Sequence, residues 1–161
     1  MIKPKMNVKI PVDNVKGIGA IWADLEAQSV LVGVPEAKAP RKAGDKANNA
    51  LLAYIHDNGS PRKGIPPRPF LGAGIKEGKN KIVAALGKVA TARMKGRPVT
   101  LDAVGLVAVN AVRAKITRGP FTPLAKSTLA RRRAKGFRGT KPLIETGQLR
   151  AAQNYVVVKN K

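Results

Sequence analysis

The order of apolar and polar positions predicts a helix followed by a strand in the first part of the chain. Over residues 13–27, apolar side chains recur at the three- and four-residue spacing of one helix face, and Asp13 or Asn14 is suited to cap its start. Residues 29–35 are rich in β-branched side chains and end at a proline, which predicts a strand. Residues 36–45 show no period, so we expect a flexible loop there. The apolar face of the helix consists of Ile18, Ile21, Trp22 and Leu25.

A second helix, a turn and an extended segment are predicted next. Residues 46–57 return to helical spacing, and Asn58-Gly59 ends the helix because both residue types tolerate left-handed and turn geometry. Residues 64–71, the proline-rich segment, carry prolines at positions 66, 67 and 69. Because proline fixes its own backbone angle and removes a donor, we expect this segment to be extended and not helical.

Two long helices are predicted in the middle of the chain, over about residues 75–95 and 99–117. Gly96-Arg97-Pro98 separates them. The second helix is apolar on most sides, which is typical of a helix that is central in a core or clamped by partners. Its apolar positions are Leu101, Val104, Leu106, Val107, Ala108, Val109, Val112 and Ile116.

A shorter helix is predicted over residues 123–135, with Thr122 as its cap and Pro123 in its first position. Gly136 suits the position just after a helix, so the helix should end there. The basic residues 136–142 that follow are expected to form a flexible segment.

A strand near residues 154–159 is predicted to close the chain, because Tyr155-Val156-Val157-Val158 is aromatic and β-branched. These elements together predict an α+β fold in a single domain over residues 1–161. In this fold a small β-sheet, including the strands near 29–35 and 154–159, packs with the two long helices and carries an extended proline-rich loop.

The charge of the chain changes what partners are expected. Lys and Arg number 31 against 9 Asp and Glu, for a net charge of +22, and residues 61–161 alone hold 23 of the basic and 3 of the acidic residues. A surface this basic repels its own copies and attracts polyanions, usually nucleic acid. No stretch approaches the ~20 apolar residues that span a bilayer, so no membrane partner is expected. Only 4% of residues are aromatic, so the core must be aliphatic, and neighbouring subunits would add to its stability.

Catalytic chemistry finds little support in the sequence. The chain has one histidine, no cysteine and nine carboxylates that stand singly, whereas proton transfer or nucleophilic attack needs a titrating group beside a partner. His56-Asp57 has the form of a base and its orienting group, but we favour a cationic His56 that faces the last carbonyls of its helix. Neither Gly72-Ala73-Gly74 nor Gly78-Lys79-Asn80 completes a phosphate-binding motif. We therefore expect no enzymatic activity, no cofactor and no metal.

A cluster of cations near residues 131–141 is the main candidate for nucleic-acid contact. Consecutive helical residues lie about 100° apart, so the three arginines at 131–133 fan around the helix, which suits phosphates and not base edges. A solvated helix end with cations near its C-terminus explains the cluster equally well. The candidate contacts are Arg131, Arg132, Arg133, Lys135, Arg138 and Lys141.

Three segments, in this order, resemble a known family. The first is Asp57-Asn58-Gly59-Ser60 followed by Ile65-Pro66-Pro67-Arg68-Pro69-Phe70-Leu71. The second is Pro120-Phe121-Thr122-Pro123-Leu124-Ala125 with the cations after it, and the third is Lys141-Pro142-Leu143-Ile144-Glu145-Thr146-Gly147-Gln148-Leu149-Arg150. Together they are similar to the virion-morphogenesis or tail-completion (neck) proteins of tailed bacteriophages, of Mu-like and lambdoid type. The resemblance covers about residues 29–158.

The resemblance implies a structural α+β assembly protein without turnover, which is made in the bacterial cytoplasm and resides in the virion, where the tail meets the head or where the tail tube closes. Its implied partners are other neck, tail or connector proteins and further copies of itself in a ring, with DNA phosphates at the opening. The proline-rich segment then becomes a preset docking surface, although an ordinary connector that packs Phe70 onto its own core explains it equally well. The candidate interface is Ile65, Pro66, Pro67, Arg68, Pro69, Phe70 and Leu71.

Two other classes of function compete with this interpretation. A free, non-sequence-specific nucleic-acid-binding protein explains the charge but not the proline-rich segment or residues 143–150. A metal-dependent nuclease would need Glu77, Asp102 and Glu145 to be gathered by the fold, and nothing in their spacing predicts this.

Overall fold

The computed structural model describes residues 15–35 and 48–160. Several predicted features lie outside these ranges. They are the caps at Asp13 and Asn14, the predicted starts of the first two helices at residues 13 and 46, and the loop at 36–45. The elements in chain order are α1 (Val15–Glu26), β1 (Gln28–Gly33), α2 (Asn49–Asn58), the 3₁₀ helix η2 (Pro61–Lys63), α3 (Leu71–Met94), α4 (Asp102–Arg118), α5 (Lys126–Ala134), α6 (Gln148–Ala152) and β2 (Asn154–Lys159). The predicted α+β fold is thereby confirmed.

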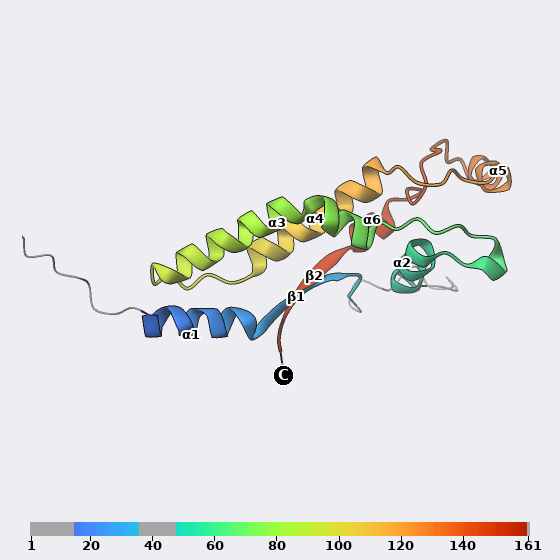
Figure 1. Cartoon of the computed structure of the whole chain (residues 1–161). Helices are drawn as coiled ribbons and strands as arrows, with labels where there is room; N and C mark the ends of the chain where they lie inside the picture. The colour runs from blue at the N-terminus through green and yellow to red at the C-terminus, as the bar shows by residue number, and fades with distance from the viewer. Residues whose placement is uncertain (1–14, 36–47, 161) are drawn as a thin grey trace, which may run out of the picture.

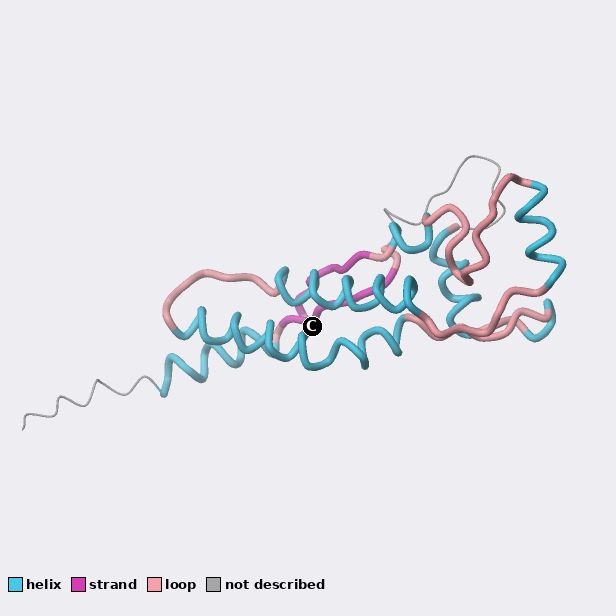
Figure 2. The backbone as a smooth tube through the Cα atoms, turned by 90° about the horizontal axis from the view of Figure 1, so that it is seen from above, coloured by secondary structure: helices cyan, strands magenta, loops and turns pink. Residues whose placement is uncertain are grey.

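The molecule is elongated (Figures 1 and 2). The α3–α4 hairpin and α1 form one end, the two strands cross the middle beside the hairpin, and α2, the proline-rich segment and α5 form the other end. The central position predicted for the second long helix is confirmed, because α4 packs against α3, both strands and α6.

β1 and β2 form an antiparallel two-stranded sheet in which Val30 pairs with Val157 and Leu31 pairs with Val156. Successive side chains of a strand point to opposite faces, so one face of the sheet carries Val30 and Val157 into the core. The other face leaves Leu31 58% exposed and Val156 43% exposed. The sheet therefore has one packed face and one apolar face that no described residue covers.

The two long helices approach closely because glycines face α4. A Cβ added to Gly74 would lie 2.8 Å from the Cα of Val112, and one added to Gly78 would lie 2.5 Å from the Cβ of Ala111. These glycines belong to the sequences that fail as phosphate-binding motifs. The fold uses them for helix packing.

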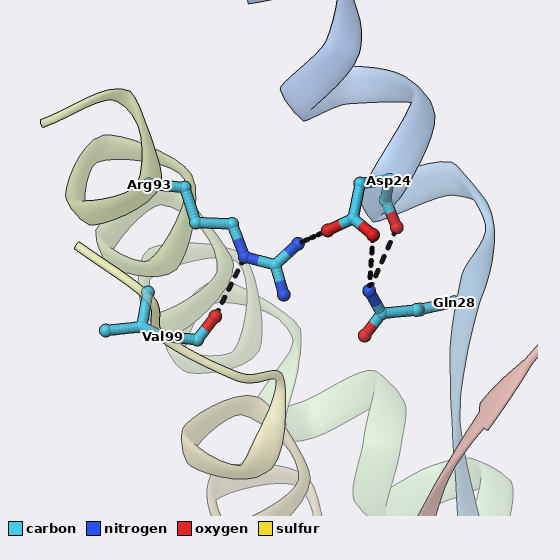
Figure 3. Close-up of polar contacts among 4 residues, drawn as sticks. All are labelled: Asp24, Gln28, Arg93 and Val99. Carbon is cyan, nitrogen blue, oxygen red and sulfur yellow. Dashed lines mark hydrogen bonds and ion pairs between the residues drawn. The ribbon is translucent and has the colours of Figure 1, made fainter. Parts of the chain in front are cut away.

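The buried side chains form two clusters along the molecule. One surrounds Phe70, Val112 and Ile116 at the proline-rich end. The other, around Val89 and Val104, lies between α1, α3, α4 and the sheet. The second cluster is closed by polar contacts shown in Figure 3, where the Asp24 carboxylate of α1 accepts from Arg93 of α3 and from Gln28.

Some helix boundaries differ from the prediction, and one short helix was missed. α3 begins at Leu71 and not near 75, because the Asp57 carboxylate accepts hydrogen bonds from the backbone N–H groups of Phe70 and Leu71 at 2.8 and 2.9 Å and caps the helix from outside. The predicted cap at Thr122 and first turn at Pro123 are wrong, because α5 begins only at Lys126. α6, within the stretch that leads to the closing strand, was not predicted at all.

Candidate functional site

The three segments that carry the family resemblance meet at one end of the molecule. Arg68 of the proline-rich segment donates from Nε to the carbonyl of Thr122 at 2.8 Å and from Nη2 to the carbonyl of Pro123 at 3.0 Å, which joins the first segment to the second. Those carbonyls are held outside α5 by this guanidinium, which accounts for the late start of the helix. The side chain is only 5% exposed, and burial and the charge of Arg132 lower the pKa of Arg68.

The turn between α2 and α3 depends on a glycine. Gly59 has a φ of 80°, and an added Cβ would lie 2.9 Å from the carbonyl oxygen of Ile65 and from the nitrogen of Pro67. The backbones of Ser60 and Ile65 pair across the base of the loop, with hydrogen bonds of 2.8 and 3.0 Å. Residues 66–70 of the proline-rich segment form neither helix nor strand, as predicted, whereas Leu71 already belongs to α3.

Much of the predicted interface segment faces inward. Phe70 is 1% exposed and belongs to the core cluster, which agrees with the ordinary connector and not with a presented aromatic. Arg68 is buried as well, and half-buried Leu71 packs against the same cluster. Pro67 and Pro69 are exposed, and Ile65 and Pro66 are half-buried. The prediction of a docking surface at residues 65–71 is therefore wrong for Phe70 and Arg68. For the other five positions, Ile65, Pro66, Pro67, Pro69 and Leu71, it stays a prediction.

One of the six predicted nucleic-acid contacts is buried. Arg132 is 5% exposed, and its Nε lies 3.3 Å from a carboxylate oxygen of Glu145. It therefore joins the second segment to the third and is unavailable to phosphates in this structure. Its Nη1 donates to the backbone oxygens of Gly139, Lys141 and Ile144 at 3.2, 2.9 and 3.0 Å. The other five cations are exposed: Arg131, Arg133, Lys135, Arg138 and Lys141.

Two adjoining cavities of about 300 and 590 Å³ lie between α2, α5, the proline-rich segment and the stretch before α6. Both are lined by His56, Arg68 and Arg131, and together we call them the basic cleft. Three further cations and several apolar residues from different elements also line the basic cleft. These residues are Lys63, Arg132 and Lys135, with Leu52, Ile65, Pro66, Leu124 and Leu143.

The electrostatics of the basic cleft overturn the cationic interpretation of His56. Burial, followed by the charges of Arg68 and Arg132, lowers the pKa of His56 below its ordinary value of 6.5. The imidazole is therefore neutral near pH 7. Its Nδ1 is buried and has no hydrogen-bond partner among the described residues.

The carboxylates considered for a metal-dependent nuclease stay apart. Glu77 pairs with Lys115, Glu145 pairs with Arg132, and Asp102 accepts a hydrogen bond from the hydroxyl of Thr100. Within residues 15–35 and 48–160 no group of three or more His, Cys, Asp or Glu side chains is placed to hold a metal ion. In the same ranges, none of the helices combines the length and the apolar character needed to cross a membrane.

The roles of Arg68 and Asp57 were not foreseen from the sequence. Arg68 binds carbonyls 54 and 55 positions away, and Asp57 caps a helix that starts 14 positions later. The one available signal was that Arg68 stands between two prolines, which restrict the local backbone. Comparisons with known proteins gave no match to a family model, to a curated protein or to a solved structure.

Proposed function

We propose that the chain is a structural assembly protein at the neck of a tailed-bacteriophage virion, acting in head–tail connection or tail completion without turnover. The order of the three resembling segments supports this proposal. Arg68 and Arg132 join these three segments into one folded unit. In the proposed assembly protein, the three segments therefore act as a single module.

The uncovered face of the two-stranded sheet is the observation that carries the proposal. Each strand pairs on one side only among the described residues, and the exposed Leu31 and Val156 lie directly opposite each other on the outer face. Open strand edges are sites where another chain can add a strand. A second copy of the chain in a ring would cover this apolar pair.

Two measurements test the proposal. Cryo-electron microscopy of purified virions should place the chain in a ring at the head–tail junction. In solution, the double variant Leu31→Lys with Val156→Lys should lose the concentration-dependent self-association of the wild type in analytical ultracentrifugation. The double variant Val83→Lys with Leu86→Lys changes two exposed apolar residues of α3 and adds the same charge, so it is the matched control and should associate normally. A chain absent from virions, or equal association of all three proteins, would contradict the proposal.

The positive charge favours a second candidate, a free nucleic-acid-binding protein. Arg133, Arg138 and Lys141 are exposed and line neither cavity of the basic cleft, so they remain available to phosphates. In the neck proposal the same cations face packaged DNA. Recovery of the chain on cellular RNA or DNA, and not in virions, would favour the second candidate.

A further inference from the structure

The basic cleft contains cations from two regions of the chain that lie far apart in sequence. Lys63 comes from η2, Arg68 from the proline-rich segment, and Arg131 and Lys135 from α5 and its C-terminal cap. The acidic residue among the lining side chains, Glu145, is already paired with Arg132. The cleft therefore holds an excess of positive charge that no described side chain neutralises.

The cations of α5 separate into two faces. Arg131 and Lys135 are four positions apart, so they lie on the same face of the helix, and both line the cleft. Arg133 lies about 200° around the helix from Arg131 and lines neither cavity. The sequence predicted that the cations of this helix fan around it. In the structure, Arg131 and Lys135 face the basic cleft, and Arg133 faces away from it.

The apolar lining narrows the class of ligand. Leu124 lines both cavities, Ile65 and Pro66 line the larger one, and Leu52 and Leu143 line the smaller one. Cavities of 300 to 590 Å³ are of the size that takes a few side chains. A nucleic-acid duplex is too wide to enter, and single strands are bound mainly on aromatic platforms, whereas no Phe, Tyr or Trp lines either cavity.

We propose that the basic cleft binds a short acidic segment of a partner protein, with its carboxylates on Arg131, Lys135 and Lys63 and an apolar side chain against Leu124 and Ile65. Charge complementarity supplies the attraction, and the buried guanidiniums of Arg68 and Arg132 add to the positive field. The inference goes beyond the proposed function, because the chemistry of the cleft is the same whichever assembly holds the chain.

The imidazole of His56 should respond when a ligand binds in the basic cleft. The charged groups around it are Arg68 from the proline-rich segment, Arg131, Arg132 and Lys135 from the α5 region, Lys63 from η2, Glu145 from the stretch before α6 and Asp57 beside it. Burial lowers the pKa of His56 most, followed by the charges of Arg68 and Arg132. A bound carboxylate would offset these charges and the peptide would change the burial, so binding should shift this pKa.

The test uses a fluorescent hexapeptide of alternating glutamate and leucine, titrated with the full chain and followed by anisotropy. The double variant Arg131→Glu with Lys135→Glu should lose about tenfold or more in affinity. The double variant Arg133→Glu with Arg138→Glu makes the same change in net charge outside the cleft and should lose much less. Circular dichroism checks that both variants fold. Equal losses in the two variants would mean general charge attraction and would overturn the proposal.

Nuclear magnetic resonance supplies a readout that does not depend on the variants folding. His56 is the single histidine of the chain, so its ring signals are assigned without ambiguity. The peptide should move these signals in the wild type and shift the pKa of His56, whereas a glutamine-for-glutamate peptide should not. Unmoved signals at saturating peptide would overturn the proposal. A DNA oligonucleotide that displaces the peptide from the wild type, and that binds less tightly to the Arg131/Lys135 variant, would also overturn the proposal. The cleft would then be a nucleic-acid site.

Discussion

At the scale of single residues, the basic cluster at 131–141 contains two kinds of cation. Arg132, like Arg68 beside it, is buried and satisfies backbone carbonyls, whereas Arg131, Arg133 and Lys135 are exposed. Net charge therefore overstates the number of groups that are available to a polyanion. A buried arginine that pairs with carbonyls is a structural residue, and removing it leaves acceptors without donors.

The first prediction concerns Arg132. Arg132→Met should lower the free energy of unfolding by about 2–4 kcal/mol, because three carbonyls lose their donor and the Glu145 carboxylate loses its ion-pair partner. Arg133→Met, at the exposed neighbouring position, should change it by no more than about 0.5 kcal/mol. Urea unfolding of both variants measures the difference. Similar small effects would mean that Arg132 has no structural role.

The second prediction concerns pH. The pKa of His56 is lowered in the folded chain, so the unfolded chain takes up a proton first as the pH falls below 6.5. The free energy of unfolding should therefore decrease from pH 7.5 toward pH 5.5, and this slope should flatten in His56→Gln. Denaturation at a series of pH values measures both slopes. A wild type that gains stability on acidification would contradict the neutral imidazole.

At the scale of elements, the periodic pattern predicted α1, both strands, α2 and the two long helices, because each has a continuous apolar face or a β-branched run. It failed where a partner distant in sequence decides the boundary. Asp57 starts α3, and Arg68 holds the residues before α5 out of the helix. Short α6 carries too few residues for a period to be visible.

The third prediction tests the contact between α3 and α4. Gly74→Ala and Gly78→Ala should each lower the free energy of unfolding by about 1–3 kcal/mol, because the added Cβ meets α4 at less than a normal contact distance. Gly87→Ala lies in the same helix with nothing near its Cβ and should raise stability by about 0.5–1 kcal/mol. Thermal unfolding compares the three variants.

A compensating change makes this test specific. Ala111→Gly removes the atom that a Cβ at position 78 would meet, so it should restore part of the stability that Gly78→Ala removes. Stabilisation by all three alanine substitutions would show that the helices separate at little cost.

At the scale of the whole molecule, the fold class was predictable and the candidate site was not. The cations at 131–141 were visible in the sequence, but their division between the core, the basic cleft and the open surface depends on contacts between three separated segments. His56 was found by its residue type, but its burial and the two nearby arginines, which lower its pKa, arise from contacts with other segments and were not visible in the sequence.

The fourth prediction concerns nucleic-acid binding by the whole chain. Replacing Arg133, Arg138 and Lys141 by Gln should reduce the slope of log affinity for duplex DNA against log salt by about 0.9 for each phosphate that the variant no longer neutralises. Replacing Lys79, Lys88 and Lys95 of the α3 region by Gln removes the same charge from exposed positions and should reduce the slope less. Anisotropy titrations from low to moderate salt give both slopes. Equal reductions would mean that DNA binds evenly over the surface.

Helix α3 is anchored at both ends, at Asp57 by its cap and at Asp24 through Arg93. Its 24 residues make a rod about 36 Å long. Because α3 also packs along α4 and contributes side chains to both buried clusters, it holds these two clusters at a fixed spacing along the molecule.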